Sequence, residues 1–210
     1  MRPRIFLADD HALLLEAFTK LLESKYDIIG TATDGRKMLA RVSKLKPHVV
    51  LMDIAMPHLN GFDAGEKLKR LMPEVKLVFL TCNEDPDMVT EAFRIGANGY
   101  LLKDSAASEL FQAIDAVLAS KNYVTPSITQ AMISSFIKHP EGHKVHGDLT
   151  IRQREVLQLL AEGLTMKQVA ADLNITARTV AFHKYQIMDE LEIKTNSQLI
   201  QYAVNHGFVA

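Results

Sequence analysis

Short apolar runs alternate with helical patterns over the first 120 residues of the chain. Each run is four to seven residues long and is followed by polar residues, as expected of strands buried on both faces of a parallel sheet. The clearest run is Val49–Met52, which leads directly into Asp53 and is broken soon afterwards by Pro57. The predicted strands cover residues 4–8, 26–32, 49–53, 75–80 and 99–102.

Apolar residues between these strands recur at every third or fourth position, which is the spacing of one buried helix face. The predicted helices cover residues 11–23, 35–45, 62–71, 85–96 and 105–120. Strands and helices that alternate in this order form a parallel, doubly wound α/β sheet with helices on both faces. The sequence therefore predicts a five-stranded α/β domain over residues 1–121.

The pattern loosens after residue 121 and becomes entirely helical after residue 147. Residues 122–147 are predicted to be a linker with a helix at 126–138 and a histidine-containing tether at 139–147, where we favour a solvated segment over a metal site. Residues 148–210 are predicted to be an all-α, four-helix domain. Thr165 with Gln168 forms a capping box, and Thr176 caps the next helix, which gives a helix-turn-helix.

Polar side chains stand at the carboxyl ends of the predicted strands, where ligands bind in open α/β sheets. Asp9 and Asp10 follow the first strand, and Asp53, Thr81 and Lys103 end the third, fourth and fifth. Three carboxylates that converge at one edge repel one another unless a cation is present, and hard oxygen ligands suit Mg²⁺. The sequence therefore predicts a magnesium site at this edge.

The same residues could carry out phosphoryl transfer. Asp53 could attack a phosphoryl group in line, while Lys103 and Thr81 hold two of its equatorial oxygens. The acyl phosphate would add about −1.5 to −2 charges and could draw Thr81 toward it. We therefore expect a switch and not a turnover enzyme.

Composition limits the class of protein further. Apolar residues make up 48% and charged residues 23% of the chain, a globular balance that argues against extensive disorder. The single cysteine, Cys82, excludes an internal disulfide. The amino terminus has no signal-peptide pattern and no apolar stretch is long enough to span a bilayer, so we expect a cytoplasmic protein without membrane contact.

These motifs resemble a two-component response regulator. Residues 1 to about 120 look like a flavodoxin-like receiver domain, and residues 148–210 look like a LuxR/FixJ/NarL-type output domain. The resemblance implies that Asp53 accepts phosphate from a cognate histidine kinase, that the Ala55 carbonyl joins the metal site, and that Tyr100 turns inward with Thr81. The residues that carry it are Asp9, Asp10, Asp53–Pro57, Gly61, Thr81, Gly99–Lys103, Leu149–Leu157, Thr179, Val180 and His183.

The helix-turn-helix predicts a promoter-DNA interface and a homodimer on activation. In a major groove, Ala181, Phe182 and Tyr185 would face base edges. The residues expected near phosphates are Thr165, Lys167, Arg178, Thr179 and Lys184. The pairing surface is predicted on the last helix, at Leu199, Ile200, Ala203 and Val204.

Two other functions remain open. Residues 148–210 carry six basic and seven acidic side chains, whereas DNA-binding modules are usually basic. Ala181 and Glu190 also stand where relatives usually carry lysine. The first alternative is therefore a regulator whose output domain binds a protein with weak or no DNA binding. The second is a phosphoryl-transfer or hydrolytic enzyme that uses Asp53, and Ala55 argues against it because phosphatases of this kind carry an acid two residues after the nucleophile.

Overall fold

The computed structural model describes residues 2–129 and 149–209. The strands are β1 (Arg4–Ala8), β2 (Asp27–Ala32), β3 (Val49–Asp53), β4 (Lys76–Thr81), β5 (Gly99–Leu102) and β6 (Tyr123–Val124). The first helices are α1 (Ala12–Leu22), α2 (Gly35–Leu45), α3 (Gly61–Leu71), α4 (Pro86–Ile95) and α5 (Ala106–Leu118). All pairs described in the sheet are parallel, in the order β2-β1-β3-β4-β5-β6.

The parallel, doubly wound α/β fold predicted from the sequence is confirmed, with one strand more than expected. The extra strand, β6, pairs Tyr123 with Gly99 and Val124 with Tyr100. A strand of two residues is too short to show a hydrophobic alternation, so the sequence pattern could not reveal it.

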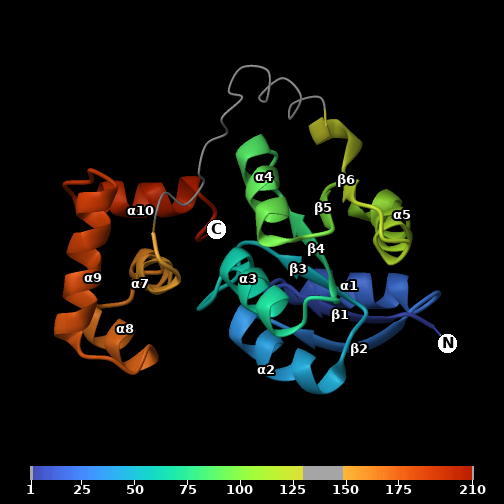
Figure 1. The fold of residues 1–210 in the computed structure, drawn as a ribbon, viewed down its shortest axis with the longest axis horizontal. Coiled ribbons are helices and arrows are strands. Elements are labelled where there is room, and N and C mark those ends of the chain that lie inside the picture. Colours follow the sequence, from blue (N-terminus) through green and yellow to red (C-terminus); the bar gives the residue numbers. More distant parts are fainter. Residues whose placement is uncertain (1, 130–148, 210) are drawn as a thin grey trace.

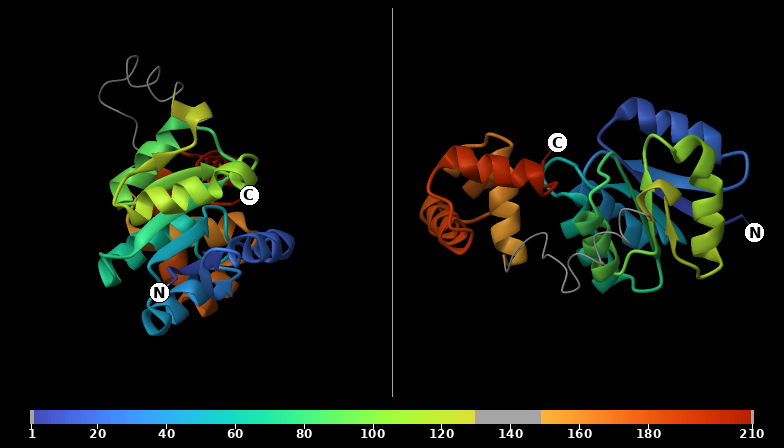
Figure 2. Two further views of the ribbon diagram at one scale, coloured as in Figure 1. Left: turned by 90° about the vertical axis from the view of Figure 1, so that its right-hand side faces the viewer. Right: turned by 90° about the horizontal axis from the view of Figure 1, so that it is seen from above.

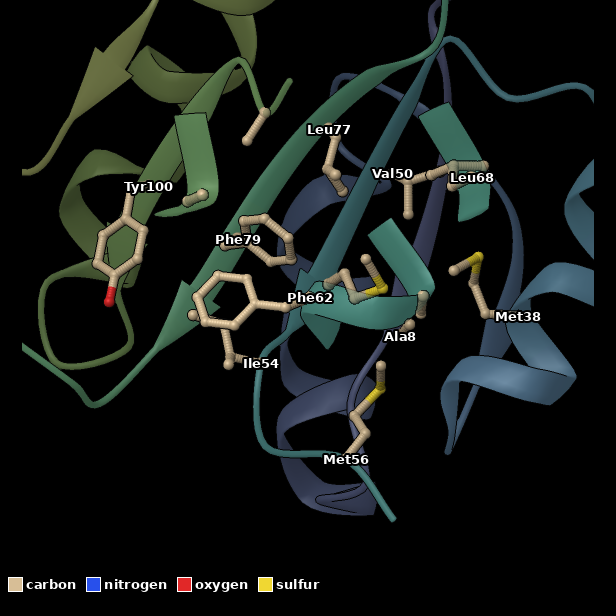
Figure 3. Close-up of a cluster of buried hydrophobic side chains, with 14 of the residues drawn as sticks. Ala8, Met38, Val50, Ile54, Met56, Phe62, Leu68, Leu77, Phe79 and Tyr100 are labelled. Atoms are coloured by element: carbon tan, nitrogen blue, oxygen red, sulfur yellow. The ribbon is translucent and has the colours of Figure 1, made fainter. Parts of the chain in front are cut away.

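Helices cover both faces of the sheet (Figure 1). One face packs against α1 and α5, and the other packs against α2, α3 and α4. Figure 3 shows the second face, where the rings of Phe62 on α3 and Phe79 on β4 meet edge to face with centroids 5.2 Å apart. Because every β3 residue is buried, Asp53 is held at a fixed place at the strand's end.

The C-terminal domain consists of α7 (Ile151–Ala161), α8 (Met166–Asp172), α9 (Ala177–Glu190) and α10 (Asn196–Asn205). The predicted four-helix arrangement is confirmed. Thr165 and Gln168 form the predicted capping box at the start of α8, and the Thr176 side chain caps α9. These caps set the turn between α8 and α9.

The chain between the two domains is described only in part. Pro126 to Thr129 are helical, whereas the rest of the predicted helix to residue 138 and the predicted tether at 139–147 lie outside the described residues. None of the helices in the described ranges is both long and apolar enough to span a bilayer. The C-terminal domain lies beside the carboxyl edge of the sheet, with α7 next to α3 (Figures 1 and 2).

Candidate functional site

The polar residues at the strand ends meet at the carboxyl edge of the sheet. Lys103 Nζ lies 2.7 Å from Asp53 Oδ2 and 2.8 Å from Asp9 Oδ2, so one ammonium bridges the ends of β1 and β3. Ligand atoms of Asp9, Asp10, His11 and Asp53 all lie within 4.8 Å of one another. The structure therefore brings the predicted carboxylates and lysine into one cluster.

Burial shifts the acid–base properties of this cluster. Asp53 is 3% exposed, and this burial raises its pKa to about 6. The Lys103 charge opposes the increase, and the negative charges of Asp9 and Asp10 add to it. Burial disfavours the charged form of Lys103 as well, but the Asp53 and Asp9 carboxylates outweigh it and raise the lysine pKa. Lys103 is therefore a permanent cation at neutral pH.

Thr81 and Tyr100 lie next to the cluster on β4 and β5. Thr81 is buried, and its Oγ1 accepts a hydrogen bond from the Asn83 backbone N–H at 3.1 Å. The Tyr100 side chain is fully buried and its hydroxyl donates to the Asn83 carbonyl oxygen at 2.8 Å. Both side chains are thus tied to the same loop after β4.

His11, which the sequence argument did not assign to the site, also lines it, together with Cys82 and Asn83. His11 Nδ1 lies 2.9 Å from Asp10 Oδ1 and 3.2 Å from Asp9 Oδ1. Its position directly after Asp9 and Asp10 in the sequence was the signal that could have placed it at the site. Ala55 also lines the site, and its backbone N–H lies 3.4 Å from Asp53 Oδ1.

In the C-terminal domain, most of the predicted contact residues lie on accessible positions. Phe182 and Tyr185 are 59% and 65% exposed on α9. Lys167 and Arg178 are exposed as well, as is Thr165 at the start of α8. Thr179 and Ala181 are half-buried, and Thr179 Oγ1 is hydrogen-bonded to Thr176 Oγ1 at 2.9 Å.

Lys184 differs from the prediction. Only 9% of it is exposed, because it lies four residues after Val180 and three before Ile187, on the inner face of α9. Its side chain therefore faces the domain and does not share the outer face with Phe182 and Tyr185. The predicted pairing surface also needs correction, since Leu199 and Ala203 are 3% and 0% exposed in the domain core.

The two domains are joined by a buried ionic contact between α3 and α7. Arg154 Nε lies 2.5 Å from Asp63 Oδ1, and its Nη2 lies 2.6 Å from Glu66 Oε2. A second pair, Lys67 with Glu155, has a distance of 2.5 Å. Asp63 is completely buried, and the guanidinium that pairs with it, Arg154, comes from the other domain.

Gln158 extends this contact along α7. It is completely buried, and its Nε2 donates to the Met56 carbonyl oxygen at 2.7 Å. Its Oε1 accepts from the Asn60 backbone N–H at 2.8 Å and from Asn60 Nδ2 at 3.1 Å. Because Met56 and Asn60 belong to the loop after Asp53, the docked domain contacts the same loop that carries the site.

A cavity of about 550 Å³ lies over the cluster and is lined by both domains. The first domain contributes Asp53, Thr81 and Lys103, and the C-terminal domain contributes Val204, Gly207 and Val209. The strand-end cluster thus opens into a space that the docked domain helps to enclose.

Comparison with known families agrees with this architecture. Residues 5–115 match the family described as response regulator receiver domain, and residues 148–203 match the family described as bacterial regulatory proteins, luxR family. The chain therefore belongs to the response regulators, in which phosphorylation of a receiver controls transcription through a DNA-binding output domain.

Individual relatives cover most of the chain. The chain is 32% identical over 209 residues to the oxygen regulatory protein NreC of Staphylococcus haemolyticus, with 96% of each chain covered. RcsB from Salmonella enterica serovar Typhimurium, solved bound to promoter P1flhDC with the phosphomimetic BeF3⁻, is 25% identical with a TM-score of 0.61, and 96% of this chain and 98% of that chain are covered. A LuxR-family response regulator from Aurantimonas sp. SI85-9A1 is 28% identical with a TM-score of 0.63, covering 65% of this chain and 99% of that one.

Proposed function

We propose that Asp53 accepts the phosphoryl group from a phosphohistidine of a cognate histidine kinase. An Asp53 carboxylate oxygen attacks phosphorus, the phosphorus–nitrogen bond breaks, and the kinase imidazole leaves with a proton. The observation that carries this proposal is the buried Lys103 ammonium, 2.7 Å from Asp53, which can hold a phosphoryl oxygen once the carboxylate is modified.

Thr81 and Tyr100 are the proposed switch residues. The phosphoryl group adds negative charge next to the Thr81 hydroxyl, which can donate to a phosphoryl oxygen. Thr81 would then give up its present role as acceptor from Asn83, and the Tyr100 hydroxyl is bound to the same residue. Phosphorylation would therefore reorganise the loop after β4.

The residues at this site fit Mg²⁺. Asp9, Asp10 and Asp53 offer hard carboxylate oxygens within one small volume, and the Ala55 carbonyl is the proposed main-chain ligand. When bound, Mg²⁺ would offset the repulsion between the carboxylates and the incoming phosphoryl group. The chain's own contribution is Lys103, which already neutralises part of the Asp9 and Asp53 charge.

Mapping the phosphoryl group tests this assignment. We expect the chain to gain one phosphoryl group on treatment with acetyl phosphate and Mg²⁺, and reductive trapping of the acyl phosphate to place the modification on Asp53. The variant Asp53→Asn should remain unmodified, and chelation of the metal should slow the reaction. Equal modification of wild type and Asp53→Asn would reject Asp53 as the acceptor.

We further propose that the output domain binds promoter DNA as a homodimer through α9. The exposed Phe182 and Tyr185, together with the half-buried Ala181, form the base-facing surface. The residues near phosphates are Thr165, Lys167, Arg178 and Thr179. On α10, Ile200 and Val204 are 43% and 46% exposed and are the part of the predicted pairing surface available to a second copy. Two half-sites would then combine weak single contacts.

The acidic balance of the output domain keeps a protein-binding function as the second candidate. Arg154 is engaged with the receiver and Lys184 faces inward, which leaves fewer cations for DNA phosphates. DNA binding must weaken as salt concentration rises, with a slope set by the number of phosphate contacts. Selection from a DNA library at two salt concentrations distinguishes the candidates, because a protein-binding output domain would enrich no sequence.

A further inference from the structure

The end of the output domain packs directly against the phosphorylation site. The C-terminal turn (Gly207–Val209) follows α10, and Gly207 and Val209 line the cavity that contains Asp53. A Cβ atom on Gly207 would overlap Met88 Cε and would lie 3.6 Å from Ile54 Cγ2. Met88 and Ile54 are each 1% exposed, so this contact is made with the receiver core and not with a loose surface.

The C-terminal turn is a folded part of the output domain. The Phe208 side chain is completely buried in that domain's core, and its backbone N–H donates to the Ala203 carbonyl oxygen at 2.9 Å. The Gly207 N–H donates to the Val204 carbonyl oxygen at 3.1 Å. The turn therefore moves with α10, and it leaves the site only when the whole output domain leaves.

The base-reading surface, in contrast, stays open in the docked state. Phe182 and Tyr185 are more than half exposed, whereas Val204 at the end of α10 lines the phosphorylation cavity. Docking thus places the end of the predicted pairing helix beside the phosphoacceptor, and it leaves the outer face of α9 accessible.

We infer that the C-terminal turn is a removable wall of the phosphorylation pocket, and that docking of the output domain restricts access to Asp53 according to the size of the phosphodonor. A cavity of about 550 Å³ has room for a small phosphodonor. A protein donor must bring a whole surface to the same opening, which the output domain occupies. The inference rests on the proposed role of Asp53 as phosphoacceptor.

Coupling of this kind works in both directions. If phosphorylation weakens docking, then any interaction that stabilises the undocked output domain must also make the Asp53 pocket more accessible to the phosphodonor. A second copy bound at Val204 would therefore expose Asp53 of the same chain to its donor. Docking of the output domain would then control the phosphorylation of Asp53 as well as respond to it.

Cys82 offers a direct test, because it is the one cysteine of the chain, is exposed, and lines the pocket. The full chain is treated in separate reactions with N-ethylmaleimide and with a polyethylene-glycol maleimide of about 5 kDa. The ratio of the two rates reports steric access, since both reagents use the same thiol chemistry at the same pH. We expect the bulky reagent to be the more strongly hindered in the wild type.

Two glycines provide a matched pair of variants. Gly207 and Gly163 both have left-handed backbone angles, with φ of +69° and +89°, but a Cβ on Gly163 would meet nothing within 4 Å. Gly207→Ala should raise the bulky-to-small rate ratio about tenfold, which corresponds to about 1.4 kcal/mol of docking free energy. Gly163→Ala shares the backbone strain and should leave the ratio unchanged. An equal ratio in Gly207→Ala and wild type would overturn the inference.

A second pair decides the question if Gly207→Ala does not fold. Val204→Glu places a charge in the pocket wall, whereas Ile200→Glu places one at a similarly exposed site one turn earlier on α10, outside that wall. Only Val204→Glu should raise the ratio, and equal ratios in both variants would overturn the inference. Labelling of the same samples with acetyl phosphate tests separately whether Asp53 is the phosphoacceptor. An error in that assignment is thereby distinguished from an error in the inference about the C-terminal turn.

Discussion

The ion pair between Arg154 and Asp63 should control whether the two domains stay docked. Replacing Arg154 by Met keeps much of the apolar stem but removes the guanidinium that lies 2.5 Å from the buried Asp63 carboxylate. In the docked state of Arg154→Met, Asp63 would be left as a buried carboxylate with the Asn60 Nδ2 hydrogen bond at 2.9 Å and the nearby charge of Lys67. In the released state, water replaces the lost partner.

The size of the effect follows from this difference between the two states. Removing one partner of a buried ion pair costs about 3–5 kcal/mol. Burial raises the pKa of Asp63, so the carboxyl can take up a proton and limit the cost. We therefore expect docking to weaken by about 3 kcal/mol, roughly a hundredfold. The Glu66 contact is partly exposed and adds less.

Small-angle X-ray scattering measures the result as an increase in the radius of gyration of the unphosphorylated chain. The matched control is Arg152→Met, because Arg152 contacts Glu155 and the Leu173 carbonyl oxygen inside the output domain, and its removal leaves the Lys67–Glu155 pair between the domains in place. The double variant Arg154→Met/Asp63→Leu should regain docking, since no charge remains buried. The reasoning is refuted if folded Arg154→Met stays as compact as Arg152→Met.

Two further predictions concern stability and DNA binding. The Asp53 pKa is raised from 3.8 to about 6, so the protonated carboxyl stabilises the fold below pH 4 and this contribution is lost as the pH rises through 6. In thermal denaturation in metal-free buffer, Asp53→Asn should therefore be more stable than wild type by up to about 3 kcal/mol at pH 7. At pH 4 the two proteins should differ little in stability. A constant difference between pH 4 and pH 7 would show that the Asp53 charge is not the cause. In DNA-binding titrations at several salt concentrations, Arg178→Ala should reduce the slope of affinity against salt by about 1. Lys184→Ala should leave this slope unchanged, because Lys184 faces inward. The opposite result would contradict the placement of these two side chains.

The sequence could predict the fold and the strand-end cluster because both depend on local patterns. Buried runs such as Val49–Met52 are recognisable as strands without any partner. The order of strands and helices then requires a parallel sheet, and a parallel sheet brings the ends of its strands to one edge. The meeting of Asp53, Thr81 and Lys103 follows from that topology.

The contact between the domains could not be predicted in this way. Arg154 and Gln158 lie four residues apart on α7, and they look like an ordinary solvent-facing stripe beside the apolar core positions. Asp63 looks like a first-turn acid of α3 that needs no partner. Their burial depends on the docking of two separate surfaces, and neither helix alone carries that information.

Lys184 was misplaced for a different reason. Its spacing from Val180 and Ile187 is the spacing of one helix face, so the periodicity already indicated an inward position. The prediction followed the charge of the side chain instead of its position. A long lysine stem can pack along apolar residues, which makes such a position possible.

The affinity for selected promoter DNA, measured before and after phosphorylation, tests the central claim that modification of Asp53 controls the output domain. The account predicts that wild type binds more tightly after treatment with acetyl phosphate and Mg²⁺, while Asp53→Asn, given the same treatment, keeps its original affinity. The account is contradicted if wild type and Asp53→Asn show the same affinity with and without the phosphodonor.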